Sequence, residues 1–303
     1  CIIKYIKKMK IVIYGSPFHE SYEITFQQII NTLEKKNIKL VFYKDFFSFT
    51  KTHKIKFQNK VEFFEDYESL KKIKNISFFL SVGGDGTFLS AITFIKDLKI
   101  PILGINTGRL GFISSIATYQ VYDAINHLLN NNFSIQKRHL LSLKTKNQIF
   151  GNMNFALNEI SVLRKDTSSM IKIHAYLNEE FLNTYWADGL IVSTPTGSTG
   201  YSLSSGGPIL IPGTNNFVIT PVAPHNLNVR PIVISSTDKI KLKVEDRDEL
   251  CLITLDSRSR AVQTSNDITI EKCNFHINII EIPGQTFIAT INEKLMWGKD
   301  KRN

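Results

Sequence analysis

Three glycine-rich segments of the chain carry residue types suited to phosphate and nucleotide groups. The first, Gly83-Gly84-Asp85-Gly86-Thr87, follows the apolar run 76–82 and opens the helical pattern 87–95. Glycine lets a backbone approach a phosphate closely, and a helix N-terminus offers free N–H groups and the positive end of the helix dipole. We therefore predict phosphate or ATP contacts at Gly83, Gly84 and Thr87.

Asp85 stands in the middle of this turn, where a carboxylate would repel phosphates. Its presence favours a chemical role, either accepting a proton or holding a metal ion. The alternative is structural, with Asp85 capping the helix that follows. Standard nucleotide fingerprints do not apply, because the chain has no Gly-Lys-Ser/Thr run and Leu89 stands where the dinucleotide pattern needs a third glycine.

The second segment, residues 104–112, places three glycines in a loop directly after another strand-like run. Such a loop must bend sharply or lie against a ligand. Asn106 could hydrogen-bond a base or a phosphate, and Arg109 could neutralise charge. A plain turn is the alternative.

The third segment, residues 188–208, is crowded with Ser, Thr and Gly between an apolar strand and a proline. Hydroxyls and bare N–H groups at this density suit phosphate, ribose and adenine edges. A linker is the alternative, although the flanking strand and Tyr201 argue against it. Asn158-Glu159 is a shorter candidate, either a grip on ribose hydroxyls or a polar pair on an edge strand.

The elements that must position these segments change character near residue 134. Before it, strand-like runs at 10–15, 40–43, 76–82 and 100–105 alternate with helical patterns at 21–36, 87–95 and 119–129, which predicts a parallel sheet covered by helices. Residues 46–60 show no clear period and are predicted to form a loop, basic at 51–60. After residue 134, short β-branched runs separated by turn residues predict a β-sandwich-like domain.

Residues 286–297 return to a helical pattern, and this terminal helix is expected to pack on the first domain. The predicted fold is thus α/β plus all-β. A Rossmann-like α/β domain spans 9–133 plus 284–303, and a β-rich domain spans 134–283. A length of 303 residues agrees with two domains of ~150 residues each.

Composition narrows the function classes. Hydrophobic residues at 43% and charged residues at 21% are typical of a globular protein, and no apolar run approaches the ~18–20 residues of a membrane span. No signal peptide is recognisable, so a cytoplasmic location is expected. Three distant cysteines and scattered histidines predict no metal site built from protein side chains. A formal charge of +10 favours anionic partners, but the lysines are dispersed and no nucleic-acid-binding motif is present.

Together and in this order, the segments resemble those of the NAD kinase family, the ATP- or polyphosphate-dependent enzymes that phosphorylate NAD to NADP. The shared sequences are GGDGT at 83–87, GINTGRLGF at 104–112, NE at 158–159 and DGLIVSTPTGSTGYSLSSGGP at 188–208. The resemblance, to the bacterial type, covers nearly the whole chain. The family's architecture agrees with the pattern of elements described above.

The resemblance implies a role at each motif. Asp85 would be the catalytic aspartate, with Gly86 beside it at the NAD site, and both would contact NAD. Asn158 and Glu159 would hold NAD through ribose and base contacts, and Asp188 would also touch it.

The resemblance also implies a nucleotide-binding run in the third segment and a pocket-lining alanine, Ala223. Within that run Tyr201 would lie against a base. The NAD-binding residues of the run are Thr199, Gly200, Tyr201, Ser202, Leu203 and Ser204.

Four positions depart from the family pattern. Gly200 stands where many members have alanine, a change that should only loosen the loop. Arg258 stands where some have glutamine, Ser169 where others carry a basic or imidazole side chain, and Trp186 where some have arginine. The last three departures concern donor contacts and leave the core chemistry intact.

The implied reaction is in-line transfer of the terminal phosphoryl group of ATP, or of polyphosphate, to the 2′-hydroxyl of the adenosine ribose of NAD. Asp85 would accept the hydroxyl proton or polarise the hydroxyl through a divalent cation, with Mg²⁺ expected on the donor phosphates. The expected partners are NAD and ATP, with no nucleic acid and no membrane, and a homo-oligomer is expected.

Three other functions remain as alternatives. GGDGT turns also occur in lipid kinases, but those need an apolar acyl pocket, whereas the third segment here is rich in hydroxyls. A non-catalytic NAD(P) sensor would not need Asp85. A nucleic-acid binder is suggested only by the net charge.

The pattern also favours Met9 as the natural start, because the first strand begins directly after it. Deleting residues 1–8 is therefore expected to leave NADP formation intact, as measured with an NADP-specific dehydrogenase. A large loss of activity would contradict this assignment.

Overall fold

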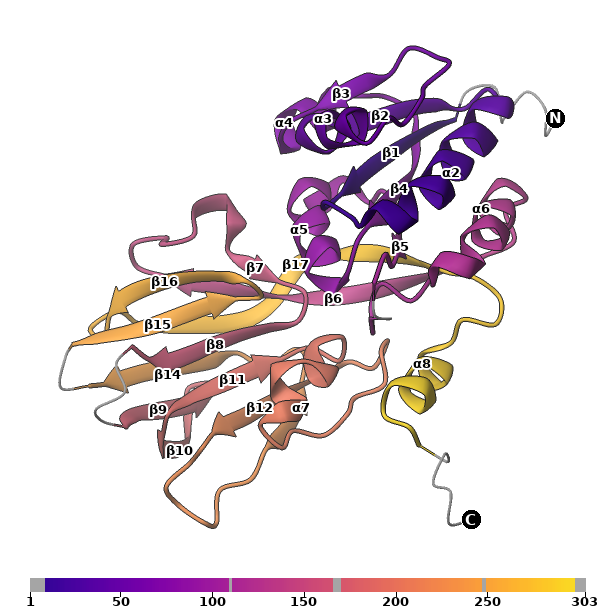
Figure 1. Ribbon diagram of the computed structural model, residues 1–303. Coiled ribbons are helices and arrows are strands. Elements are labelled where there is room, and N and C mark those ends of the chain that lie inside the picture. Colours follow the sequence, from indigo (N-terminus) through magenta and orange to yellow (C-terminus); the bar gives the residue numbers. More distant parts are fainter. Residues whose placement is uncertain (1–8, 109–110, 166–169, 247–248, 298–303) are drawn as a thin grey trace. The chain divides into compact units, whose positions relative to one another are not determined.

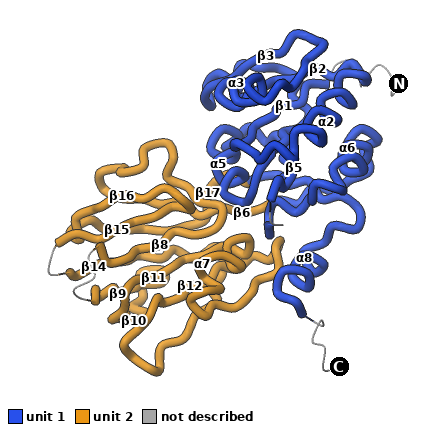
Figure 2. The backbone as a smooth tube through the Cα atoms, viewed as in Figure 1, with its two compact units in different colours: residues 1–137, 277–303 blue, residues 138–276 orange. Residues whose placement is uncertain are grey.

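A computed structural model describes residues 9–108, 111–165, 170–246 and 249–297. The chain divides into two compact units, residues 1–137 with 277–303 and residues 138–276 (Figure 2). Strand β17 (Ile268–Glu281) runs from the second unit back into the first. Arg109 and Ser169, two residues singled out from the sequence, lie outside the described residues.

The first unit contains a parallel sheet with the strand order β3-β2-β1-β4-β5 (Figure 1). Its strands are β1 (Lys10–Gly15), β2 (Lys39–Tyr43), β3 (Glu62–Phe64), β4 (Ile76–Val82) and β5 (Ile102–Ile105). The end of β17 extends this sheet, since Ile279 pairs with Ile102 in parallel register. The four strands predicted in this region are confirmed, and β3 was missed because it is three residues long.

Helices of this unit pack on the sheet through apolar faces. Helix α2 lies beside α6, and α4 lies beside α5. The terminal helix α8 belongs to this unit, as expected. The helices are α2 (Glu23–Lys35), α3 (Lys44–Thr52), α4 (Tyr67–Lys72), α5 (Asp85–Ile95), α6 (Val121–Leu129) and α8 (Phe287–Lys294).

The prediction of a loop over residues 46–60 is wrong in its first half, because α3 continues to Thr52. The helix buries Phe46 and Thr50 and exposes its lysines, and nine residues are too few for this spacing to stand out in the sequence. Gly15 makes room for the Phe46 ring: a Cβ at residue 15 would lie 2.4 Å from it.

Helix α2 fixes the rest of the basic segment. The buried Glu34 carboxylate accepts the backbone N–H groups of Gln58 and Asn59 at 2.9–3.1 Å. Gln27 accepts the N–H of Lys56 at 2.7 Å and donates to its carbonyl at 2.9 Å. The segment is therefore held by specific polar contacts.

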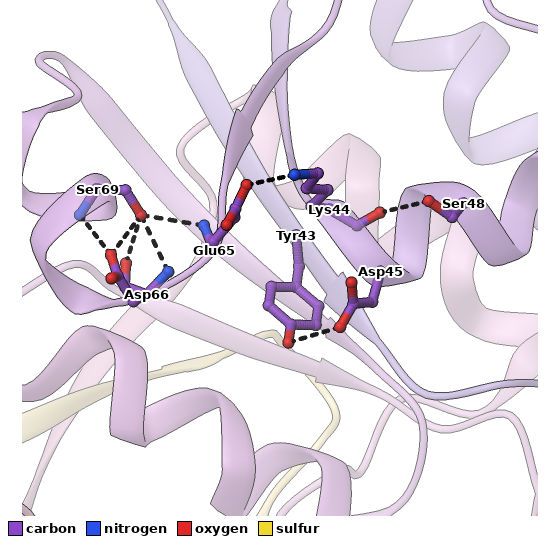
Figure 3. Close-up of polar contacts among 7 residues, drawn as sticks. All are labelled: Tyr43, Lys44, Asp45, Ser48, Glu65, Asp66 and Ser69. Atoms are coloured by element: carbon purple, nitrogen blue, oxygen red, sulfur yellow. Dashed lines mark hydrogen bonds and ion pairs between the residues drawn. The ribbon is translucent and has the colours of Figure 1, made fainter.

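Exposed polar contacts organise the edge of the same sheet (Figure 3). Asp66 caps α4 by accepting the N–H of Ser69 at 2.8 Å, and the Ser69 hydroxyl accepts the N–H of Asp66 at 3.0 Å. The Ser69 N–H holds the pKa of Asp66 below its usual range. Lys44 pairs with Glu65 at 2.6 Å, which ties the start of α3 to the residue after β3.

The second unit consists of two sheets around a shared core. One is antiparallel with the order β13-β12-β11-β8-β15-β16, and the other contains β10-β9-β14-β17 with β6 and β7. Short strands separated by turns, the pattern predicted for this region, are confirmed. The bounds are β6 (Ser134–Thr145), β7 (Phe155–Ala156), β8 (Glu159–Arg164), β9 (Ile171–Leu177), β10 (Glu180–Ala187), β11 (Gly189–Ser193), β12 (Asn216–Val222), β13 (Ile232–Ser235), β14 (Ile240–Glu245), β15 (Leu250–Leu255) and β16 (Arg258–Gln263).

Alternating side chains of both sheets fill the core of the second unit. Ile160 and Val162 of β8 belong to one buried cluster with Ile171 and Ile173 of β9. Period-two alternation of this kind places every second residue of a strand in the core. Residues that follow or precede these strands are therefore fixed by the ladder, and the candidate site uses several of them.

Replacing Glu34 by alanine is expected to release residues 56–60. The N–H groups of Gln58 and Asn59 lose their acceptor, so their hydrogen exchange should quicken and the free energy of unfolding should fall by about 1–2 kcal/mol. Glu65→Ala, which removes an exposed ion pair, is the control and should cost under about 1 kcal/mol. Unchanged exchange at these two amides in Glu34→Ala would show that Glu34 does not hold the segment.

Candidate active site

The GGDGT turn lies at the topological switch point of the parallel sheet. Strands β1 and β4 are neighbours, but β1 connects toward β2 on one side and β4 toward β5 on the other. Ligands of open α/β sheets bind at the carboxyl ends of two such strands. Here Ser16 after β1 donates its N–H to Val82 at 3.1 Å, and the Thr87 hydroxyl donates to the Ser16 hydroxyl at 2.9 Å.

The three glycines of the turn serve different purposes. Gly83 has φ +149°, and a Cβ there would lie 2.3 Å from Thr87 Oγ1. Glycine at this position is therefore required by the packing of the turn itself. A Cβ added at Gly84 or Gly86 would meet no described atom within 4 Å beyond its chain neighbours and its own helix, which leaves this side of the backbone open to a ligand. Gly84 is the N-cap of α5, where no side chain caps the helix, so the N–H groups of its first turn remain available for an anion.

Asp85 begins α5, and its carboxylate accepts hydrogen bonds from a different loop. The N–H of Phe112 donates to Oδ2 at 2.9 Å, and those of Ile113 and Ser114 donate to Oδ1 at 3.2 and 2.8 Å. A carboxylate oxygen has two lone pairs, so Oδ2 keeps one for a further donor. The structural alternative from the sequence is therefore wrong in its detail, because Asp85 fixes residues 112–114 and does not cap its own helix.

The second glycine segment surrounds Asp85 closely. A Cβ at Gly111 would lie 1.9 Å from Asp85 Oδ1, so only glycine leaves the carboxylate in this position. Asn106 is buried and uses its amide inside the loop, donating to the Ser114 carbonyl at 3.3 Å and accepting the Gly108 N–H at 2.7 Å. This placement explains the loop's shape and gives no support to the phosphate contact predicted for Asn106.

In the second unit, Asn158 and Glu159 lie against residues 193–200. Asn158 pairs through its carbonyl with the N–H of Thr194 at 2.9 Å, and the Thr194 hydroxyl donates to Leu157 at 2.6 Å. A Cβ at Gly200 would lie 3.3 Å from Glu159 Oε2 and 3.8 Å from Asn158 Nδ2. The structure therefore brings together the NE pair and the start of the predicted nucleotide-binding run.

Asn158 Oδ1 and Glu159 Oε2 are buried oxygens without a hydrogen-bond partner among the described residues. Burial, with a smaller contribution from the negative charge of Asp256, raises the pKa of Glu159 to about 8. A buried polar atom without a partner is costly and is characteristic of a functional position. These two oxygens are the clearest sign of a ligand site in the second unit.

The remaining predicted residues occupy varied surroundings. Asp188 forms a two-point pair with Arg164 at 3.2 Å and lies next to Ala223, since its N–H bonds Val222 at 3.0 Å. Ala223 has φ +43°, an unusual conformation for a residue other than glycine.

Within the nucleotide-binding run, Tyr201 is 40% exposed at the start of the short helix α7 (Tyr201–Ser204) and is free to stack on a base. Ser202 is turned into the core, where its hydroxyl bonds Thr220 at 2.8 Å. Thr199 donates its hydroxyl to Thr196 at 3.3 Å. The run thus presents Tyr201 outward and uses Ser202 to anchor itself.

Sequence reasoning missed Asp256 as a member of this cluster. Its carboxylate accepts the backbone N–H groups of Leu157, Asn158 and Glu159. Arg258, noted as a departure, donates to the carbonyls of Met153 and Phe155. The sequence of a short hairpin does not indicate a partner about 100 residues away. The only available signal was the position of Asp256, two residues before Arg258.

The described residues contain no group of three or more His, Cys, Asp or Glu side chains able to hold a metal ion. Asp85 offers a single free lone pair. No helix in the described part of the chain is both long and apolar enough to cross a membrane.

Comparisons with known proteins agree with this architecture. Residues 11–133 match the ATP-NAD kinase N-terminal domain, and residues 157–282 match the ATP-NAD kinase C-terminal domain. Curated relatives named NAD kinase include those of Flavobacterium psychrophilum, 48% identical, and Flavobacterium johnsoniae, 43% identical, each over 97% of this chain and 100% of the relative. The relative from Bacteroides fragilis is 38% identical over 97% of this chain and 100% of its own length.

Two solved structures share the fold. A yeast NADH kinase complexed with NADH has a TM-score of 0.83 at 22% identity, over 96% of this chain and 88% of that chain. An NAD kinase from Archaeoglobus fulgidus in complex with ATP has a TM-score of 0.68 at 24% identity, over 94% and 98%. The predicted α/β plus β-rich architecture is confirmed. With both domain matches and these relatives, the chain belongs to the NAD kinase family.

Proposed function

We propose that the chain transfers the terminal phosphoryl group of ATP to the 2′-hydroxyl of the adenosine ribose of NAD, giving NADP, with Asp85 as the proton acceptor. The observation that carries this proposal is the position of Asp85 at the switch point, where a carboxylate with one free lone pair stands beside open N–H groups. Membership of the NAD kinase family is the basis for proposing ATP and NAD as the substrates.

The chemistry of Asp85 follows from its contacts. A ribose hydroxyl is a poor nucleophile, and a positioned base typically contributes 10²–10⁴-fold to the rate. Oδ2 is the oxygen with capacity left, so it would receive the hydroxyl proton while the hydroxyl oxygen attacks the terminal phosphorus and the bond to the departing ADP oxygen breaks. Three N–H donors hold the carboxylate still and so favour one approach direction.

The phosphate contacts proposed for the donor are the N–H groups at the start of α5. Gly84 and Gly86 leave the backbone bare, and the positive end of the helix dipole faces the same side. Mg²⁺ would enter with ATP as part of that substrate. It would neutralise negative charge on the donor phosphates.

Most of the proposed NAD contacts lie in the second unit. Buried oxygens of Asn158 and Glu159 would each gain a partner from a hydroxyl or an amino group, which offsets the cost of leaving them unpaired. A protonated Glu159 can also donate a hydrogen bond. Tyr201 offers an exposed ring for a base, while the buried Ser202 anchors the run through Thr220. The proposed set also contains Asp188, Ala223, Thr199, Gly200, Leu203 and Ser204 of this unit, and Gly86 of the first unit.

We further propose a cytoplasmic site of action, a divalent cation delivered by ATP, and assembly into a homo-oligomer. The support is membership of a family of enzymes that act on soluble nucleotides. A non-catalytic NAD(P) sensor is the second candidate function, and it predicts NAD binding without NADP formation from ATP, from polyphosphate or with NADH as acceptor.

Asp85→Asn is expected to lower NADP formation by about 10²–10⁴-fold while NAD affinity stays within about threefold. NADP is read with an NADP-specific dehydrogenase, and NAD binding by calorimetry. Because asparagine also weakens the anchor of residues 112–114, the thermal unfolding of the variant is measured alongside. Near-normal turnover by the folded variant would rule out Asp85 as the proton acceptor.

Gly111→Ala tests the placement of Asp85 without changing its chemistry. The added Cβ must displace the carboxylate, and a displacement of about 1 Å costs on the order of 10²-fold in rate. Gly108→Ala is the matched control in the same loop, since its Cβ would come no closer than 3.9 Å to a described atom outside its chain neighbours. Equal rates for the two variants would mean that the position of Asp85 does not limit turnover.

A further inference from the structure

The hairpin between β15 and β16 ends in a two-residue turn formed by Asp256 and Ser257. Leu255 pairs directly with Arg258 across the turn. Asp256 adopts a left-handed conformation with φ +51°, which Asp and Asn tolerate better than most residues. The turn therefore directs the Asp256 carboxylate along the neighbouring strand β8 and not into solvent.

Four hydrogen bonds join this turn to the residues at the start of β8. Asp256 Oδ1 accepts the N–H of Asn158 at 2.8 Å and of Glu159 at 3.3 Å, and Oδ2 accepts the N–H of Leu157 at 3.0 Å. Asp256 returns its own N–H to the Glu159 carbonyl at 3.0 Å. Three successive N–H groups thus converge on one carboxylate, which fixes the peptide planes on both sides of Asn158.

Arg258 supports the same segment from its other end. Its guanidinium donates to the Met153 carbonyl at 2.6 Å and to the Phe155 carbonyl, and it lies 5.3 Å from the centre of the Phe155 ring. Its positive charge also acts on Asp256. The hairpin therefore holds residues 153–159 at both ends: Arg258 binds the carbonyls of residues 153 and 155, and Asp256 binds the N–H groups of residues 157–159.

We propose that Asp256 is a positioning residue for NAD binding: its carboxylate sets the backbone of residues 157–159 and thereby directs the side chains of Asn158 and Glu159 toward the dinucleotide. This inference rests on the proposed function. The two side-chain oxygens that lack partners, Asn158 Oδ1 and Glu159 Oε2, belong to the residues that this carboxylate holds. The hydrogen bonds of the Asp256 carboxylate all go to the backbone of residues 157–159.

Electrostatics adds a second effect of the same side chain. The charge of Asp256 contributes to the raised pKa of Glu159, which lies at about 8. The elements packed here, β11, β15 and residues 193–200, contain no Asp, Glu, Lys, Arg or His. Two cations lie nearby: Arg138 of β6 donates to the Thr196 hydroxyl at 3.4 Å, and Arg258 donates to the Met153 and Phe155 carbonyls. Without the Asp256 charge, the pKa of Glu159 falls and its carboxyl ionises at lower pH.

The experiment compares wild type, Asp256→Asn and Ser257→Ala for NAD binding by calorimetry and for the KM values of NAD and ATP. Asparagine suits the left-handed turn but cannot accept at both side-chain positions, so one N–H loses its acceptor. NAD binding should weaken roughly 10-fold, with the KM for ATP within about twofold. Ser257→Ala, in the same exposed turn, should match wild type.

Measuring NAD affinity over a pH series distinguishes this role from a loss of stability, because reduced stability alone would not shift the pH midpoint. A protonated Glu159 can donate a hydrogen bond to NAD and an ionised one cannot, so wild-type affinity should fall as the pH rises through about 8, the pKa of Glu159. In Asp256→Asn the fall should occur at lower pH. An unfolding defect alone would lower the folded fraction and the apparent kcat, leaving this midpoint and the KM for NAD unchanged.

Asp256→Asn that binds NAD within about twofold of wild type with an unmoved midpoint would overturn the proposal, as would a wild type that does not bind NAD. If Asp256→Asn does not fold, Asp256→Ser, which retains one acceptor, is judged by the same criteria. A wild type that binds NAD but makes no NADP would refute the proposed reaction alone, because the binding comparison still decides the role of Asp256.

Discussion

Backbone N–H groups that gather around a carboxylate determine the geometry of the candidate residues in each unit. Asp85 accepts the N–H groups of residues 112–114, and Asp256 accepts those of residues 157–159. Each carboxylate satisfies three successive backbone donors, whose burial without a partner would be costly. Gly111 leaves room for Asp85, and Gly197 leaves room for the backbone of Asn158.

The two carboxylates differ in what they can do beyond accepting these three backbone hydrogen bonds. Asp85 lies at the exposed end of a parallel sheet and keeps a lone pair on Oδ2 beside the open start of α5. Asp256 lies against β8 and passes its influence to Asn158 and Glu159 through their backbone. Under the proposed function, the same arrangement would act directly in phosphoryl transfer in the first unit and indirectly, through NAD binding, in the second.

The sequence was sufficient for the fold class and for the motif-bearing strand ends, because buried parallel strands read as continuous apolar runs and glycine turns are locally encoded. It was insufficient for α3, because nine residues rich in lysine and phenylalanine are too few to show a clear amphipathic period. It was also insufficient for β3, which is too short to show alternation. Asp256 was invisible because its contacts join positions about 100 residues apart. Ser202 shows what a hydroxyl-rich run cannot reveal by itself, since its side chain bonds Thr220 in the core while that of Tyr201, the residue before it, is exposed.

Glu159 has a consequence for the stability of the second unit. Its pKa in the folded chain, about 8, exceeds the value of an ordinary glutamate, so the folded state binds a proton more tightly than the unfolded state and stability declines as the pH rises from about 4.5 toward 8. The chain thus carries a standing penalty in neutral solution that an apolar residue of similar size would remove. Under the proposed role of Glu159 in NAD binding, a screen for thermostable variants would favour apolar substitutions at this position and would thereby select for weaker NAD binding.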